Sequence, residues 1–310
     1  MIAVVFPGQG AQYVGMGKDL YEAFPEAREV FELAEDLTGL PLRRLCFEGP
    51  EKELTETSRL QPALTAVNLS VWRVLSARGL RPAFFAGHSL GEFSALCAAG
   101  VLSLEDTFRL TKLRGELMSR AGEEAPGAMY AVIGLSRESL TEILSRVSGR
   151  VYLANHNSPE QSVISGEEEA AAKAAEEARA AGAKRVVKLS VSGAFHSPLM
   201  EKAAQRFAEA LRETPFSPAR IPVVLNVTAT PETDPERIRE ALSRQMLSPV
   251  RWVESVEAMY AAGVRTFLEA GPKRVLSGLI KRILSGKEFR VLQAETPGEI
   301  EALFREMGED

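Results

Sequence analysis

Apolar positions along this chain switch between the close spacing of buried strands and the wider spacing of amphipathic helices. An apolar run at residues 2–6 is followed by helical spacing from about 25 to 37. A longer helical pattern begins at residue 58 and leads to a second apolar run at 83–86. Strands that alternate with helices in this way predict an α/β fold with a mostly parallel sheet.

The segment 127–190 has a different rhythm, with short elements in the order strand, helix, strand, strand, helix, strand. Its second strand is expected at residues 151–154. This βαββαβ order is typical of a ferredoxin-like unit. We therefore predict one large α/β core made of residues 1–126 and 191–310, into which residues 127–190 are inserted as a small subdomain. After the insert, the pattern predicts strands at 222–226, 266–269 and 290–292 and helices at 236–246, 253–262 and 275–284.

Composition excludes several classes of function. The 310 residues are 45% hydrophobic and 25% charged, as in ordinary soluble globular proteins, and the net charge of -5 disfavours binding to nucleic acid or to an acidic membrane. No apolar stretch approaches a transmembrane span and the first residues lack a signal-peptide pattern, so we expect a cytoplasmic protein. We also expect a monomer. Cys46 and Cys97 lack metal or redox spacing and histidines are few, so no metal site and no cofactor are expected.

The segment Gly87-His88-Ser89-Leu90-Gly91 directly follows the second apolar run and precedes a helix-compatible segment. Strand, sharp turn and helix around such a serine form a nucleophile elbow, which holds the hydroxyl at a helix N-terminus. The helix dipole and free backbone N–H groups there favour negative charge on a carbonyl oxygen under attack. As a bare pattern, the five residues fit an ordinary serine-capped helix start equally well.

A nucleophilic serine needs a base within reach, and the histidines are the candidates. His88 adjoins the serine, so its side chain should point away from the hydroxyl. His156 lies at the end of a predicted subdomain strand and is interpreted as a loop or hinge residue. His196 is the strongest candidate because it immediately precedes a helix that Ser197 can cap. A merely structural polar residue before a helix is the alternative.

An acid that would complete a triad with His196 is missing, because no Asp or Glu occupies an obvious motif. A backbone or amide carbonyl could serve instead, since any acceptor at the second ring nitrogen fixes the tautomer. More than a hundred residues follow His196, whereas an α/β-hydrolase would usually place its histidine near the C-terminus. Both features favour a Ser-His dyad on another fold.

Arg114 lies within an apolar helical stripe formed by Leu110, Leu113, Leu117 and Met118. A guanidinium on such a stripe needs an anionic partner. That partner is either a fixed Asp or Glu, which position alone favours, or the carboxylate of a substrate. In the second case the fork-shaped donor would select acyl groups that carry a carboxylate.

The loop Gly8-Gln9-Gly10 does not match a nucleotide-binding motif. Tyr13 stands where a dinucleotide fingerprint needs glycine, and Asp19 stands where a P-loop needs Ser or Thr. Free N–H groups in this loop can still bind an oxyanion. Gln9 is therefore a candidate oxyanion donor, paired with the N–H of Leu90 just after the nucleophile. A simple tight turn is the alternative.

These motifs can be read together with others along the chain. They are Phe6-Pro7-Gly8-Gln9-Gly10-Ala11-Gln12, Gln61-Pro62-Ala63, Gly87-His88-Ser89-Leu90-Gly91-Glu92, Arg114-Gly115, Gly127-Ala128-Met129, Asn155-His156-Asn157-Ser158-Pro159, Gly193-Ala194-Phe195-His196-Ser197, Asn226-Val227-Thr228-Ala229, Ser248-Pro249-Val250-Arg251-Trp252 and Glu269-Ala270-Gly271-Pro272. Their order and spacing strongly resemble the malonyl-CoA:acyl carrier protein transacylases, the acyltransferase family of fatty acid and polyketide synthesis. The resemblance covers nearly the whole chain. It implies a hydrolase-like α/β core with an inserted ferredoxin-like subdomain and an active site in the cleft between them.

The resemblance also implies catalytic roles. Ser89 is expected to be the acylated nucleophile, His196 its base and Arg114 the clamp on the malonyl carboxylate. The main-chain carbonyl of Gln245 is expected to orient the histidine, which would explain the missing acid. The expected oxyanion donors are Gln9 and Leu90.

Further residues are implied to bind the substrate. They are Gln9, Gln61, His88, Met118, Asn155 and Phe195, the last of which matches the malonyl-selective form of its motif. One departure from the family pattern is Lys273, because many members have a further glycine after the proline of Gly271-Pro272. This departure leaves the chemistry intact and makes the local turn uncertain.

The activity implied by the resemblance is transfer of a malonyl group from malonyl-CoA to the phosphopantetheine thiol of an acidic acyl carrier protein. It would run as a ping-pong reaction through a malonyl-serine ester and supply fatty acid biosynthesis. A serine esterase or thioesterase with the same elbow, or a trans-acting acyltransferase of polyketide synthesis, is the alternative. A noncatalytic protein with a degenerate acyltransferase fold is a third possibility, against which the retained serine, histidine and arginine argue.

Overall fold

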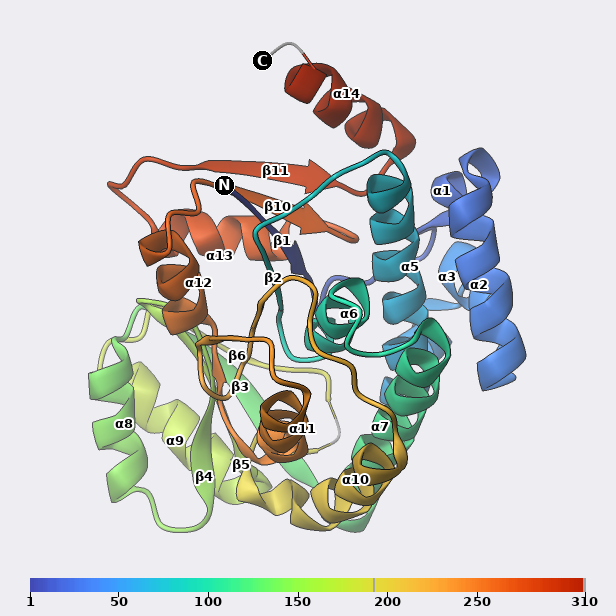
Figure 1. Ribbon diagram of the computed structural model, residues 1–310. Coiled ribbons are helices and arrows are strands. Elements are labelled where there is room, and N and C mark those ends of the chain that lie inside the picture. Colours follow the sequence, from blue (N-terminus) through green and yellow to red (C-terminus); the bar gives the residue numbers. More distant parts are fainter. Residues whose placement is uncertain (192, 309–310) are drawn as a thin grey trace.

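The larger part of the molecule is built on a mostly parallel sheet (Figure 1). The computed structural model describes residues 1–191 and 193–308. Strands β1, β2, β7, β10 and β11 pair in parallel, and β8 closes one edge antiparallel to β7. In spatial order the strands are β11 (Arg290–Ala294), β10 (Thr266–Ala270), β1 (Ile2–Phe6), β2 (Phe84–Gly87), β7 (Val223–Val224) and β8 (Pro231–Glu232).

Helices cover both faces of this sheet, and β1 shows why. Because successive side chains of a strand point to opposite faces, Ala3 and Val5 pack on one side while Val4 and Phe6 pack on the other. The first side is covered by α12 (Trp252–Ala261) and α13 (Val275–Ile283), and the second by α5 (Thr57–Ala77) and α6 (Gly91–Ala98) (Figure 1). A sheet buried on both faces explains the continuous apolar runs in the sequence.

The remaining helices surround this core. Ser103 caps α7 by accepting the N–H of Asp106, as the sequence indicated. Short helices α1, α3 and α4 were not predicted, since fewer than two turns leave no periodic signal. None of the described helices is long and apolar enough to cross a membrane. The bounds are α1 (Lys18–Ala23), α2 (Pro25–Thr38), α3 (Leu42–Phe47), α4 (Glu51–Leu54), α7 (Leu104–Glu124), α10 (Glu201–Glu213), α11 (Pro235–Arg244) and α14 (Pro297–Gly308), with 3-10 turns η1 (Pro198–Met200) and η2 (Gln245–Leu247).

The predicted insert forms a second sheet in the βαββαβ order, which confirms this part of the fold class. Its elements are β3 (Gly127–Ile133), α8 (Arg137–Arg146), β4 (Val151–Ser158), β5 (Gln161–Glu167), α9 (Glu168–Ala180) and β6 (Arg185–Lys188). One face of this sheet is buried, because Tyr130 and Val132 of β3 pack on the alanines of α9. The opposite face carries Met129 and Ala131, which line a cavity shared with the core.

The sheet of the insert also contains a strand from outside segment 127–190. Strand β9 (Val250–Arg251) lies parallel to β4, with Asn155 opposite Val250 and His156 opposite Arg251. Strand β4 extends to Ser158, so the prediction that it ends at residue 154 and that His156 is a loop residue was wrong. Asn is disfavoured in strands, but pairing of β4 on both sides overrides that preference here.

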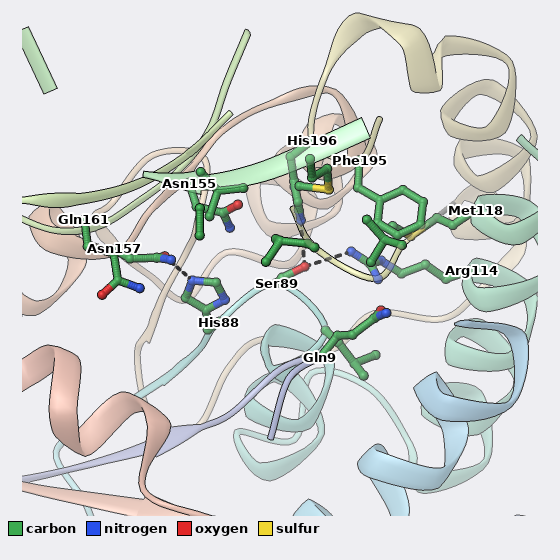
Figure 2. Close-up of a pocket in the computed structure, with 16 residues that line it drawn as sticks. Gln9, His88, Ser89, Arg114, Met118, Asn155, Asn157, Gln161, Phe195 and His196 are labelled. Atoms are coloured by element: carbon green, nitrogen blue, oxygen red, sulfur yellow. Dashed lines mark hydrogen bonds between the residues drawn. The ribbon is translucent and has the colours of Figure 1, made fainter. Parts of the chain in front are cut away.

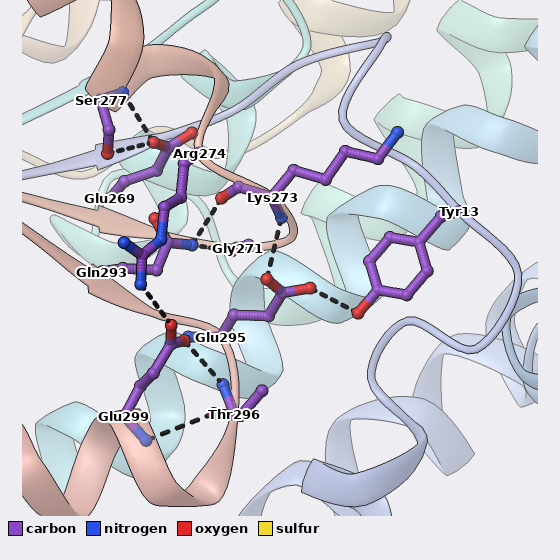
Figure 3. Close-up of polar contacts among 10 residues, drawn as sticks. All are labelled: Tyr13, Glu269, Gly271, Lys273, Arg274, Ser277, Gln293, Glu295, Thr296 and Glu299. Carbon is purple, nitrogen blue, oxygen red and sulfur yellow. Dashed lines mark hydrogen bonds and ion pairs between the residues drawn. The ribbon is translucent and has the colours of Figure 1, made fainter.

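A polar cluster joins the C-terminal strands to the N-terminal loop (Figure 3). The Glu295 carboxylate accepts hydrogen bonds from the Tyr13 hydroxyl at 2.5 Å and from the Lys273 main-chain N–H at 3.0 Å. Lys273 has a φ of 60°, a left-handed conformation that glycine adopts at no steric cost. At Gly271, an added Cβ would lie 2.8 Å from the Pro7 ring, so this turn abuts the loop that carries Gln9.

Candidate active site

Ser89 lies on a strained turn between β2 and α6. Its φ is 51°, in the left-handed region that non-glycine residues rarely adopt. The flanking glycines allow the strand and helix to cross closely: a Cβ at Gly87 would lie 2.0 Å from the carbonyl carbon of Gly91, and one at Gly91 would lie 2.1 Å from the Phe6 carbonyl oxygen. The geometry is that of a nucleophile elbow and not of an ordinary helix cap.

Asn226 fastens the elbow from the end of β7. Its Oδ1 accepts the Ser89 N–H at 2.7 Å, and its Nδ2 donates to the Gly87 carbonyl at 2.6 Å. The Asn226 N–H in turn donates to Oε2 of Glu92 at 2.8 Å. Sequence reasoning assigned no role to Asn226 or Glu92. The available signals were an asparagine at the end of an apolar strand and a lone acid in a helix of small and apolar residues.

His196 meets the serine as predicted, with 2.7 Å between Ser89 Oγ and His196 Nε2. Its other ring nitrogen, Nδ1, lies 3.0 Å from the Gln245 carbonyl oxygen and 3.2 Å from that of Ser248. Carbonyl oxygens only accept, so Nδ1 carries the proton and Nε2 is free to accept the serine proton. Burial, and then the positive charge of Arg114, lower the pKa of His196 to about 3 despite these carbonyls.

Arg114 projects from α7 to the same point and is 1% exposed. Its guanidinium donates to Oε1 of Gln61 at 2.9 Å, to Oε1 of Gln245 at 3.0 Å and to Ser89 Oγ at 3.3 Å. No Asp or Glu of the described residues lies within ion-pair distance of Arg114, and its Nε has no hydrogen-bond partner among them. Burial lowers the pKa of Arg114 to about 10, against the opposing charge of Glu92. Neutral amides therefore hold a cation whose direct anionic partner is not a fixed side chain.

Gln9 and Leu90 both line the cavity at Ser89. Within the described ranges, neither main-chain N–H has a hydrogen-bond partner. Leu90 precedes α6, so its N–H is one of the free donors at a helix N-terminus. Two free donors beside the nucleophile are the arrangement that stabilises a tetrahedral oxyanion.

The cavity around Ser89 has a volume of about 200 Å³ and lies between the core and the insert (Figure 2). Of the predicted substrate-binding residues, Gln9, His88, Met118, Asn155 and Phe195 line it together with Arg114. Gln61 contacts the site only through Arg114. The His88 ring points away from Ser89 to Asn157, at 2.7 Å, as expected, and His156 lies against Glu254.

No group of three or more His, Cys, Asp or Glu side chains in residues 1–191 and 193–308 is arranged to hold a metal ion. The groups gathered around the cavity are the serine, the histidine, the arginine and the two N–H groups. Such a set suits acyl transfer through a serine ester to an acyl group that carries a carboxylate.

Comparison with known proteins agrees with this geometry. The family described as acyl transferase domain matches residues 3–295. The chain belongs to the acyl transferase family. This acyl transferase is 44% identical over 271 residues to the malonyl CoA-acyl carrier protein transacylase of Bacillus subtilis (strain 168), and the match covers 86% of each chain. It is 44% identical over 270 residues to the protein of that name from Escherichia coli (strain K12), covering 86% of this chain and 87% of the relative.

Solved structures show the same acyl transferase fold. The acyl-carrier-protein-S-malonyltransferase of Bartonella henselae superposes with a TM-score of 0.94 at 45% identity and covers 99% of both chains. A type II PKS acyl-carrier protein in complex with its malonyl-transacylase gives a TM-score of 0.95 at 43% identity, covering 98% of this chain and 99% of that one. The predicted family and fold class are thereby confirmed.

Proposed function

We propose that this chain transfers malonyl groups from malonyl-CoA to the phosphopantetheine thiol of an acyl carrier protein. The observation that carries the proposal is a buried arginine that lies 3.3 Å from the nucleophilic hydroxyl and is held by amides, with no acid among the described residues in ion-pair contact. An amide-held guanidinium fork is preorganised for a carboxylate at the far end of a serine-bound acyl group. Relatives named for malonyl transfer, and a solved relative bound to a carrier protein, support the same substrates.

The first half-reaction forms a malonyl ester on Ser89. His196 Nε2 accepts the hydroxyl proton as Oγ attacks the thioester carbonyl, and the N–H groups of Gln9 and Leu90 stabilise the oxyanion. The Gln245 carbonyl stabilises the imidazolium through Nδ1–H. When the C–S bond breaks, the imidazolium protonates the departing CoA thiolate, so the histidine is neutral again.

The second half-reaction reverses these steps with the carrier thiol. The thiol gives its proton to His196 and attacks the ester carbonyl, and the histidine returns that proton to Ser89 Oγ as the C–O bond breaks. Water competes for the same ester. The narrow cavity between core and insert favours the thiol, because a pantetheine arm that fills it leaves little room for water.

We propose that this reaction supplies malonyl units to fatty acid synthesis. Polyketide synthesis is the alternative pathway that could use the same chemistry. A cytoplasmic location, a monomeric enzyme and the absence of a resident cofactor stay predictions. A serine thioesterase with the same elbow is the competing function. It would release free malonate without a carrier protein.

The test is transfer of radiolabelled malonyl from malonyl-CoA to holo acyl carrier protein. We expect malonyl-carrier product from the native chain, none from Ser89→Ala, and native activity from Ser145→Ala, which removes an exposed hydroxyl on α8. Full activity in Ser89→Ala, or free malonate as the main product of the native chain, would contradict the proposal.

A further inference from the structure

Glu92 is a fully buried carboxylate with no part in the mechanism above. It is 0% exposed and is the charged residue of α6, a helix otherwise built from small and apolar side chains and one serine. Oε2 accepts the Asn226 N–H at 2.8 Å, while Oε1 has no hydrogen-bond partner in the part of the chain that the structure describes. A buried carboxylate with one unpaired oxygen lowers the stability of the fold, so a functional role is expected for it here.

Arg114 is the charged group that acts on Glu92. Among the charged side chains of the described ranges, Arg114 lowers the pKa of Glu92, and Glu92 in turn raises the pKa of Arg114. The two are not in ion-pair contact within 4.0 Å among the described residues. The side chain of Gln245 binds Arg114 through Oε1 and the Ser89 carbonyl through Nε2. Arginine and glutamate are thus a separated pair of opposite charges in a buried site.

The other titratable groups of the site do not contribute charge. Burial, and then the Arg114 charge, lower the pKa of His196 to about 3, and burial also lowers the pKa of His88. Both histidines are therefore neutral near pH 7. Burial raises the pKa of Glu92 to about 7, against the opposing effects of the Asn226 N–H, the Gln245 side chain and Arg114. Of these groups, Glu92 is the one poised to change its charge near neutral pH.

A malonyl carboxylate bound at Arg114 would place a second anion beside the same cation. In a buried site, two carboxylates that share one positive charge do not both stay ionised. The substrate carboxylate would be hydrogen-bonded directly to the guanidinium, whereas Glu92 is separated from it. The proton therefore goes to Glu92, whose Oε1 has no hydrogen-bond partner among residues 1–191 and 193–308.

We propose that Glu92 is a positioning residue that serves as the exchangeable counter-charge of Arg114, ionised in the empty site and protonated while a malonyl carboxylate is bound. This inference rests on the proposed function. The proton comes from solvent on binding and returns to solvent when the malonyl group leaves, and no bond to the substrate is made or broken. At a pH above the pKa of Glu92, the buried cluster keeps zero net charge in both states, so the charge of Arg114 stays compensated throughout the cycle.

Proton uptake on binding tests the proposal directly. Ser89→Ala allows malonyl-CoA to bind without acylation, and calorimetry in two buffers with different ionisation enthalpies counts the protons taken up. From the pKa of Glu92 we expect about half a proton at pH 7 and close to one at pH 8. Acetyl-CoA, which has the same CoA part and no carboxylate, should give no uptake at either pH.

Two variants in the Ser89→Ala background identify the proton acceptor. Glu92→Gln keeps an oxygen that accepts the Asn226 N–H but cannot titrate, so uptake should vanish and malonyl-CoA should bind about tenfold tighter at pH 8. His196→Ala should leave uptake unchanged. Uptake that persists in Glu92→Gln, or disappears in His196→Ala, overturns the proposal.

If Glu92→Gln does not fold, the unsubstituted residue still decides the question. Uptake that does not decrease from pH 8 to pH 6 overturns the role of Glu92. Failure of the proposed function looks different, because malonyl-CoA would then bind no better than acetyl-CoA.

Discussion

Replacing Arg114 with alanine should separate substrates with a carboxylate from those without one. The guanidinium is 1% exposed, and the structure gives it two amide partners and the Ser89 hydroxyl. A malonyl carboxylate bound there loses its cation in Arg114→Ala. Breaking one side of a buried charge pair costs about 3–5 kcal/mol, which is roughly a 10²- to 5 × 10³-fold loss in kcat/KM for malonyl-CoA.

Acetyl-CoA should lose much less in the same variant. Its acyl group has no carboxylate, so among the reacting groups the change affects only the long 3.3 Å contact from the guanidinium to Ser89 Oγ. A hydrogen bond from a charged donor contributes about 1.5–3 kcal/mol, and this long contact lies at the lower limit, which corresponds to about tenfold. The ratio of malonyl to acetyl transfer should therefore decrease by at least about tenfold.

The assay is transfer of each radiolabelled acyl group to holo acyl carrier protein, with thermal unfolding measured for every variant. Arg114→Lys is the matched control, because it keeps the charge and loses the fork, and it should lie between the native chain and Arg114→Ala. Equal losses on both acyl groups, at unchanged melting temperature, would refute the reasoning and make Arg114 a structural residue.

Two further predictions concern the base and the turn after β10. Burial and Arg114 lower the pKa of His196 to about 3, so the base stays neutral at moderate acidity. The rate of the acylation burst with p-nitrophenyl acetate should therefore not change between pH 8 and pH 5. A decrease centred near the ordinary histidine pKa of about 6.5 would contradict this. Lys273→Gly should raise stability by up to about 1 kcal/mol in thermal unfolding, because it relieves a φ of 60° while keeping the N–H that binds Glu295. A lower melting temperature would show that the Lys273 side chain itself stabilises the turn.

Sequence reasoning predicted the local parts of the site well. The elbow at Ser89 is encoded within a few residues by its glycines and the preceding apolar run. Ser103, as an N-cap residue, likewise indicates locally where α7 begins. His196 was found because histidine is the usual base for a serine, few histidines exist, and this one precedes a helix that Ser197 can cap. Local chemistry of this kind is readable because neighbouring residues decide it.

The long-range parts could not be derived from residue patterns alone. Ser89 and Asn226 are 137 positions apart, and Arg114 and Gln245 are 131 apart, yet each pair is hydrogen-bonded. Nothing in the spacing of asparagine or glutamine indicates such a contact. The fixed acid that position favoured for Arg114 is likewise not found in contact with it in the described ranges, because amides take its place. The two-residue strand β9 is too short to show any periodicity.

Strand β9 has a consequence for building hybrid enzymes. It follows within a few residues of the Gln245 and Ser248 carbonyls that hold the histidine, and it pairs with β4 where Asn155 enters the cavity. An exchange of residues 127–190 alone would join a foreign β4 to the native β9 and disturb the alignment of the base. A chimera that transplants residues 127–190 together with residues 245–251 keeps the pairing of β4 with β9 intact. These two segments therefore form one unit of exchange.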